Sequence, residues 1–109
     1  MAKHEFGIMQ VSPGASVRYD AYEPWKYNCI SVEDDCVARI APMLKNIDLF
    51  WHCVNIPGKG IAYCGITLIP PASMQQILNI IAPVDALAAL KTLLESALRE
   101  DKWVIHFGI

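Results

Sequence analysis

The sequence has little charge and no concentration of positive charge. Only 18% of its 109 residues are charged, and the formal net charge is −2 at pH 7. The nine lysines and arginines are scattered along the chain and form no basic stripe. A nucleic-acid-binding surface needs clustered positive charge, because much of its affinity comes from displacing counterions from phosphates. We therefore expect no nucleic-acid partner.

Long apolar runs are also missing, although hydrophobic residues make up 54% of the chain. A membrane-spanning helix needs about 20 consecutive apolar residues. The longest candidate, residues 61–72, is shorter and is interrupted by one glycine, one threonine and two prolines. The first residues carry charge with no apolar segment behind it, unlike a secretory signal. These absences predict a cytoplasmic protein with no membrane partner.

Motifs that hold metals, phosphates or cofactors are absent too. The four cysteines occur singly in apolar segments, with no C-x-x-C spacing: Cys29, Cys36, Cys53 and Cys64. Such thiols are typical of buried free cysteines in a reducing compartment. Residues 57–60, Pro-Gly-Lys-Gly, lack the longer P-loop pattern. We expect no metal and no cofactor, and no residue is assigned a catalytic role by motif.

The length fits one domain, since domains cluster near about 100–150 residues. Residues 1–109 are therefore interpreted as a single α+β domain. Its residues 1–25 are expected to form an irregular segment that packs on the sheet, because prolines and glycine punctuate them. A small domain has much surface for its volume, so the surplus of apolar residues favours an exposed apolar patch and self-association.

Hydrophobic periodicity predicts the regular elements from residue 26 onward. Strands are expected at 27–32, 49–56, 61–69 and 103–107, and helices at 34–47, from 70, and from 85. This β-α-β-β-α(α)-β order resembles the ferredoxin-like topology, which implies a two-layer sandwich of an antiparallel sheet with helices on one face. Residues 4–11 are expected to add an N-terminal edge strand. A topology alone implies no function.

The strands 49–56 and 61–69 are expected to form a hairpin around a two-residue turn at 58–59. This register places Cys53 opposite Cys64 and directs one set of side chains toward the helices: Leu49, Trp51, Cys53, Cys64, Ile66 and Leu68. The opposite face then carries Phe50, His52 and Tyr63 with other apolar residues, and His106 is expected to share it. A four-residue loop would exchange the two faces.

An apolar outer sheet face needs a cover, and three covers are consistent with the sequence. They are a second copy of the chain, the segment 12–24, or a ligand. Tyr19 and Tyr22 lie within this segment, and Trp25 directly follows it. They are interpreted either as a lid over a pocket or, more commonly for large rings in a loop, as anchors that hold the loop to the body.

The ligand-binding candidates are therefore the polar and aromatic residues of this face and segment: His52, His106, Tyr63, Phe50, Tyr19, Tyr22 and Trp25. A histidine on an apolar face is more often a hydrogen-bonded structural residue than a general base, and no nucleophile or carboxylate is placed beside either one. His4, near the terminus, is expected to be exposed.

Two functions follow from this interpretation. The first is a non-enzymatic cytoplasmic protein that acts as a homodimer, or binds another protein, through the apolar sheet face. The second is a small-molecule-binding domain or minor enzyme with a pocket between the sheet and the aromatic segment 19–27. No motif in the sequence identifies a substrate or a protein partner.

Overall fold

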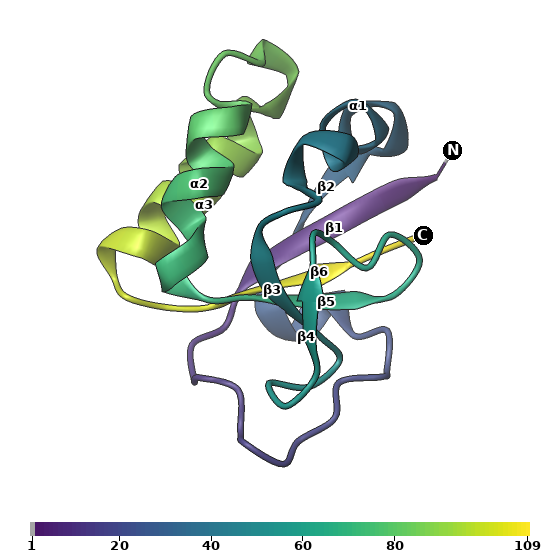
Figure 1. Cartoon of the computed structure of the whole chain (residues 1–109), viewed down its shortest axis with the longest axis vertical. Coiled ribbons are helices and arrows are strands. Elements are labelled where there is room, and N and C mark those ends of the chain that lie inside the picture. The colour runs from purple at the N-terminus through teal and green to yellow at the C-terminus, as the bar shows by residue number, and fades with distance from the viewer. Residues whose placement is uncertain (1) are drawn as a thin grey trace.

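A six-stranded antiparallel sheet lies at the centre of the structure, and three α-helices cover one of its faces (Figure 1). The computed structural model describes residues 2–109. The opposite face of the sheet carries a long connecting segment between the first two strands, drawn below the sheet in Figure 1. This arrangement confirms an α+β chain with an antiparallel sheet and the helices on one side.

The elements follow the predicted order along the chain, with one extra short strand. The strands are β1 (Lys3–Ile8), β2 (Ile30–Glu33), β3 (Asp48–Trp51), β4 (Pro57–Lys59), β5 (Ile66–Ile69) and β6 (Val104–Phe107). The helices are α1 (Asp34–Leu44), α2 (Pro71–Ile81) and α3 (Ala88–Arg99), and the short 3-10 turns are η1 (Pro24–Tyr27) and η2 (Asp85–Leu87). No helix among residues 2–109 combines the length and the apolar character that crossing a membrane requires.

The neighbours in the sheet differ from the ferredoxin-like arrangement. The strand order is β2-β1-β6-β5-β3-β4, and every pairing is antiparallel. β1 lies between β2 and β6, so the expectation of an N-terminal edge strand is wrong, and β2 is the edge instead. The reason is visible in β1 itself: Phe6 and Gly7 are both buried although they point to opposite faces. A strand covered on both faces belongs inside a sheet.

The predicted hairpin is also different in the structure. β3 ends at Trp51, the chain turns through residues 52–56, and residues 57–59 return as β4 beside β3. The residues expected to form the turn, 58–59, therefore both lie in a strand. His52 has a φ of 66°, in the left-handed region, and this conformation starts the earlier turn. The Trp51 indole donates a hydrogen bond to the Gly60 carbonyl at 2.9 Å and holds the returning chain.

β5 pairs with the other edge of β3, one residue away from the expected register. Phe50 lies opposite Leu68 and Trp51 opposite Thr67. A shift of one residue exchanges the faces of a strand. Leu68 and Ile66 consequently point away from the helices, in contrast to the prediction, while Leu49 packs against the helices and Phe50 points away from them, as predicted.

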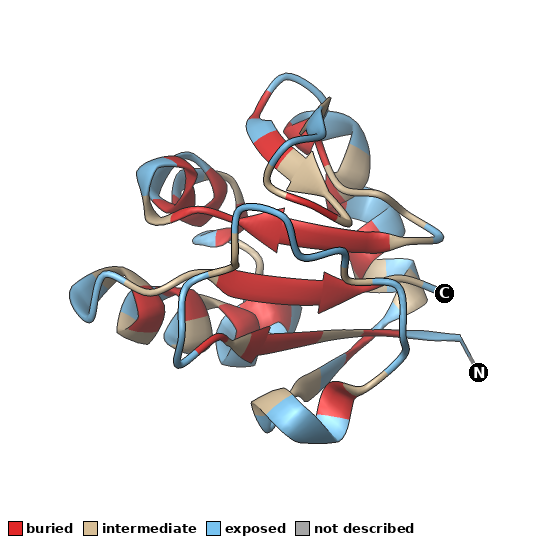
Figure 2. Ribbon diagram, turned by 90° about the horizontal axis from the view of Figure 1, so that it is seen from below, coloured by how far each residue is buried: buried red, intermediate tan, exposed pale blue. Residues whose placement is uncertain are grey.

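Two apolar clusters fill the two sides of the sheet. The helix side contains Phe6, Leu49, Ile69 and Val104 from the strands, packed with residues such as Val37, Met74 and Leu94 from the helices. The other side contains Met9, Ile66, Leu68, Ile105 and Phe107, and partly buried residues that include Tyr19, Tyr27 and Cys29 pack on them. Three covers were expected for this face: a second copy of the chain, a segment of the chain itself, or a ligand. The structure shows that a segment of the chain itself lies on it (Figure 2).

Gly7 lets this segment cross β1 at close range. A Cβ atom at this position would lie 2.6 Å from Tyr27 Cβ and 2.7 Å from both the Tyr27 carbonyl oxygen and Cys29 Sγ. These distances are shorter than real Cβ contacts, so only glycine fits between the sheet and the segment. We refer below to residues 9–29 as the covering segment.

Candidate functional site

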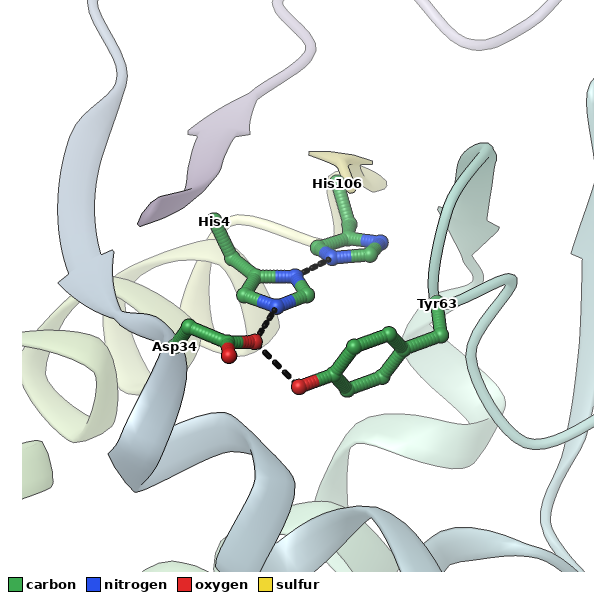
Figure 3. Close-up of polar contacts among 4 residues, drawn as sticks. All are labelled: His4, Asp34, Tyr63 and His106. Atoms are coloured by element: carbon green, nitrogen blue, oxygen red, sulfur yellow. Dashed lines mark hydrogen bonds and ion pairs between the residues drawn. The ribbon is translucent and has the colours of Figure 1, made fainter. Parts of the chain in front are cut away.

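Polar side chains collect in two places on opposite faces of the sheet. The first, which we call the histidine relay, consists of His4, His106, Asp34 and Tyr63 and lies on the helix side (Figure 3). The second, which we call the His52 pocket, lies where the covering segment meets β5 and β6.

The histidine relay joins four separate parts of the chain. His4 comes from β1 and His106 from the neighbouring β6, and both imidazoles point toward the helices and have no exposed area. Asp34 is the first residue of α1, and Tyr63 belongs to the connection between β4 and β5. The two imidazoles are nearly parallel, with ring centroids 5.1 Å apart, and the Tyr63 ring meets His4 edge-on at 4.7 Å.

The outer end of the relay is the carboxylate of Asp34. One carboxylate oxygen, Oδ1, lies 2.9 Å from His4 Nε2 and also accepts a hydrogen bond from the Tyr63 hydroxyl. The Asp34 side chain is 28% exposed, so this end reaches the surface while His4 does not. The buried imidazole is thereby connected to solvent through one carboxylate.

The inner end of the relay is closed by a hydroxyl. His4 Nδ1 lies 2.9 Å from His106 Nε2, and His106 Nδ1 lies 3.1 Å from Thr67 Oγ1. The Ala62 amide donates to the same Thr67 oxygen at 2.8 Å. No buried side-chain nitrogen or oxygen among residues 2–109 lacks a hydrogen-bond partner, so the relay is fully satisfied.

With both imidazoles neutral, one placement of protons satisfies every pair. Asp34 only accepts when ionised, so His4 Nε2 donates to it and His4 Nδ1 accepts from His106 Nε2. His106 Nδ1 then accepts from the Thr67 hydroxyl. Thr67 thus donates to His106, His106 to His4 and His4 to Asp34, so the series of hydrogen bonds ends at the carboxylate.

Electrostatics hold three of the four relay members in one protonation state near neutral pH. Burial is the main cause that lowers the pKa of His106 to about 3, and a proton on the neighbouring His4 would lower it further. Hydrogen bonds from Tyr63 and His4 lower the pKa of Asp34, and the bond to Asp34 is the main cause that raises the pKa of Tyr63 to about 12. General acid–base groups work best with a pKa near the operating pH. The relay therefore suits a structural connection between β1, β6, α1 and the 61–65 loop.

The His52 pocket has a volume of about 170 Å³. Asp20 and Tyr22 of the covering segment line one side, and His52, Cys64, Gly65 and Phe107 line the rest. The Tyr22 and Phe107 rings meet edge-on with centroids 5.6 Å apart. The pocket thus combines aromatic rings with a carboxylate, an imidazole and a thiol.

The covering segment fixes the orientation of the His52 imidazole. Nδ1 lies 3.0 Å from the Tyr19 carbonyl oxygen and 3.0 Å from Asp20 Oδ1. Both partners only accept, so Nδ1 carries the proton and Nε2 of the neutral ring is left as an acceptor. Nε2 packs against Gly65, where a Cβ atom would lie only 2.8 Å from it. The strained φ of 66° at His52 is one way of holding a side chain in a fixed position.

The four cysteines are free thiols, as expected, but they are not all buried. Cys53 is buried and Cys29 is half-buried, and burial raises the pKa of Cys29 to about 12. Cys64 is exposed and lines the His52 pocket, so the prediction of a buried thiol is wrong at this position. Its burial was expected from the apolar neighbours in sequence, but the strand begins only at residue 66. Within residues 2–109 no group of three or more potential ligands could hold a metal ion.

The predicted site residues do not form one site. Tyr19, Tyr22 and His52 come together at the His52 pocket, while His106 and Tyr63 belong to the histidine relay on the other face. The expectation that His106 shares the outer face with His52 is wrong, because His106 alternates with Ile105 and Phe107, which face outward. Phe50 packs against Trp103 with ring centroids 5.7 Å apart, and Trp25 is 70% exposed.

The predicted ligand-binding residues did not include His4 and Asp34 of the relay, or Asp20 and Cys64 of the pocket. His4 was expected to be exposed, yet it is completely buried. The signal that could have predicted this burial is the spacing of His4 and Phe6, which lie on the same face of a strand that is covered on both sides. Asp20 and Cys64 gave no such signal, since their meeting depends on where the covering segment crosses the sheet.

Comparisons with known proteins found no matching family model, no similar curated protein and no similar solved structure. The geometry of the two clusters is therefore the only guide to function.

Proposed function

We propose that this protein binds a small molecule in the His52 pocket, between the sheet and the segment 19–27. The observation that carries the proposal is the fixed imidazole. Tyr19 and Asp20 lie at Nδ1 of His52, so Nε2 is left as an oriented acceptor on a side chain that lines the pocket. Small-molecule sites are concave and largely apolar, with a few polar groups that set the orientation of the ligand. The free thiols support a location in the cytoplasm.

The size of the pocket limits the ligand group that enters it. A cavity of about 150 Å³ is large enough to hold benzene, and this pocket has about 170 Å³. The rings of Tyr22 and Phe107 offer apolar contact, and Nε2 of His52 accepts a hydrogen bond. The best fit is therefore one ring-sized group with a single N–H or O–H donor, and any larger part of the ligand would extend outside.

Phenol and anisole form a matched pair of probes for this proposal, because only phenol has a donor. We expect millimolar phenol to shift the backbone amide NMR signals of Tyr22, Gly65 and Phe107 and to raise the melting temperature, since a ligand bound only by the folded state stabilises it. Anisole should bind at least about 5-fold more weakly, which corresponds to one hydrogen bond of about 1 kcal/mol.

The variant His52→Asn removes Nε2 while keeping a residue that tolerates a positive φ. It should bind phenol and anisole equally weakly. Asn79→Ala, an exposed change on α2 outside the pocket, serves as the control and should bind as the wild type does. Absence of any shift at the three amides, or an equal response of His52→Asn and wild type to phenol, would contradict the proposal.

A second candidate function is binding of a protein, including a second copy of the chain. The covering segment occupies the sheet face that first suggested a homodimer, so a protein partner would contact the outer surface of that segment. Trp25 is 70% exposed and Tyr22 is 58% exposed, and their rings lie edge-on with centroids 6.4 Å apart. Exposed Trp and Tyr side chains are enriched at the centres of protein interfaces.

A further inference from the structure

We propose that Cys64 is a nucleophile that accepts an acyl group from a small ester or thioester, with His52 as its general base. The inference rests on the proposed function, because the same pocket would hold the substrate. Cysteine nucleophiles are activated by a neighbouring base that a third group orients. The His52 pocket contains all three kinds of group.

The imidazole lies in the connection that leaves β3, and the thiol lies in the connection that enters β5. His52 directly follows β3, and Cys64 lies two residues before β5. Nε2 of His52 packs against Gly65, the residue next to Cys64, and both side chains line the same 170 Å³ cavity. The backbone amide of His52 donates to the Ile66 carbonyl at 3.0 Å, which ties the two connections together. The base therefore lies beside the chain segment that carries the thiol.

Asp20 acts as a positioning residue for His52. Its Oδ1 atom lies 3.0 Å from Nδ1, and the Tyr19 carbonyl accepts a hydrogen bond from the same nitrogen. The other carboxylate oxygen of Asp20 accepts from Arg18 Nε at 2.6 Å. The hydrogen bond to the Tyr19 carbonyl fixes the tautomer with Nε2 free, and the nearby Asp20 carboxylate stabilises the imidazolium that forms when Nε2 takes a proton.

The other three thiols lack these features. Cys53 is buried, and burial raises the pKa of the half-buried Cys29 to about 12. Cys36 is half-buried on α1, on the helix side of the sheet. The thiolate is the reactive form of cysteine, and access of the substrate is also required. Cys64 alone is both exposed and in the pocket with His52.

The reaction proceeds in two balanced steps. Nε2 of His52 takes the thiol proton while the sulfur of Cys64 bonds to the carbonyl carbon of the substrate. The bond from that carbon to the leaving group breaks, and the leaving alcohol or thiol takes the proton from Nε2. Water then attacks the thioester with His52 as base, which releases the carboxylic acid and restores the Cys64 thiol.

Para-nitrophenyl acetate is a suitable probe because acylation releases coloured para-nitrophenol. We expect a burst of one equivalent per protein, saturation with ester concentration, and one acetyl group on Cys64 by peptide mass spectrometry. His52→Asn should slow acylation at least about 100-fold, the lower range of general base catalysis. Asp20→Asn should lower the maximal rate and leave the half-saturating ester concentration unchanged. Cys36→Ser should behave as the wild type does, and Cys64→Ser should show no burst.

Three results would overturn the proposal: acetylation of Cys64 that does not depend on His52, acetylation that does not saturate with ester concentration, or equal acetylation of Cys36 and Cys64. Phenol binding separates this inference from the function on which it rests. Phenol binding with an unreactive Cys64 would refute the nucleophile and leave the binding pocket in place. Absence of phenol binding would refute the proposed pocket whatever the thiol does.

Discussion

The surroundings of His106 lower its pKa far below the usual range of a histidine. Its side chain has no exposed area, and both ring nitrogens have partners inside the protein. Burial is the largest cause of its lowered pKa, because the charged imidazolium loses its hydration. Its hydrogen bonds to His4 and Thr67 are directional, so the neutral ring both fills space and connects β6 to its two neighbours.

The low pKa of His106 makes the free energy of unfolding depend on pH. The unfolded chain binds a proton at the ordinary histidine pKa of about 6.5, whereas the folded chain binds it only near pH 3. Between these pH values the unfolded state binds more protons than the folded state. The contribution of His106 to the free energy of unfolding is therefore complete above about pH 6.5 and is lost as the pH falls toward 3. The slope from this one residue is at most about 1.4 kcal/mol per pH unit.

The variant His106→Gln should have a flatter pH dependence of stability in this window, because its side chain does not titrate. We expect it to lose about 1–3 kcal/mol at neutral pH through disrupted hydrogen bonds. Urea unfolding followed by circular dichroism at several pH values measures both effects. Asn79→Ala, exposed on α2, should retain the wild-type slope. A His106→Gln slope equal to that of the wild type would show that His106 is not the source of the pH dependence.

At the scale of elements, the covering segment crosses β1 so closely that Gly7 leaves no room for a side chain. Gly7→Ala would place Cβ within 2.7 Å of both Tyr27 and Cys29. Two of the three atoms it meets belong to backbone or Cβ positions, which cannot rotate away. We expect Gly7→Ala to destabilise the fold by about 1–3 kcal/mol, the usual cost of overpacking, and to release the segment from the sheet.

Gly14→Ala is the matched control for this substitution. Its Cβ would meet mainly the end of the Val17 side chain, at 2.7 Å, and that exposed side chain can move. Limited proteolysis within residues 11–23 should be faster in Gly7→Ala and unchanged in Gly14→Ala. Equal stability of Gly7→Ala and wild type would mean that the segment crosses β1 at a larger distance.

The elements that the sequence predicts well are those with a strong local pattern. The helix that begins at Asp34 is expected from its acidic first turn and from the spacing of Val37, Ile40 and Leu44, and all three are buried. The positions of the strands and the turn within residues 49–60 were harder to predict, because Pro-Gly-Lys-Gly at 57–60 is a typical turn sequence. The turn instead forms at His52, whose positive φ carries no sequence signal. The register of β5 against β3 also differs by one residue from the expected one, and this difference changes which face Leu68 covers.

The candidate site was predictable only in its residue types. His52, Tyr19 and Tyr22 were expected near one another because the aromatic segment and the outer sheet face both needed a partner. Asp20 and Cys64 join them through contacts between segments far apart in sequence, which local patterns do not encode. The histidine relay was unpredictable for a similar reason, because β1 had to be placed inside the sheet before His4 could meet His106.

At the scale of the whole molecule, the outer surface of the covering segment decides whether the chain works alone. If Trp25 is the centre of an interface, the sedimentation coefficient should rise with protein concentration, and Trp25→Glu should abolish the rise because a charge cannot be buried there without a partner. Val11→Glu, at a position 79% exposed and elsewhere on the segment, should leave the rise unchanged. A monomer at every concentration would contradict self-association.

The pairing of β1 with β6 has a consequence for the newborn chain. His4 and His106 are neighbours in the sheet but stand 102 positions apart in sequence. At a synthesis rate of ~5–20 residues per second, β1 leaves the ribosome about 5 to 20 s before β6. During that time one edge of β1 has no strand to pair with, and the buried faces of Phe6 and Ile8 are open to water. The β1–β6 pairing, and with it the contact between His4 and His106, therefore forms only after β6 has been synthesised.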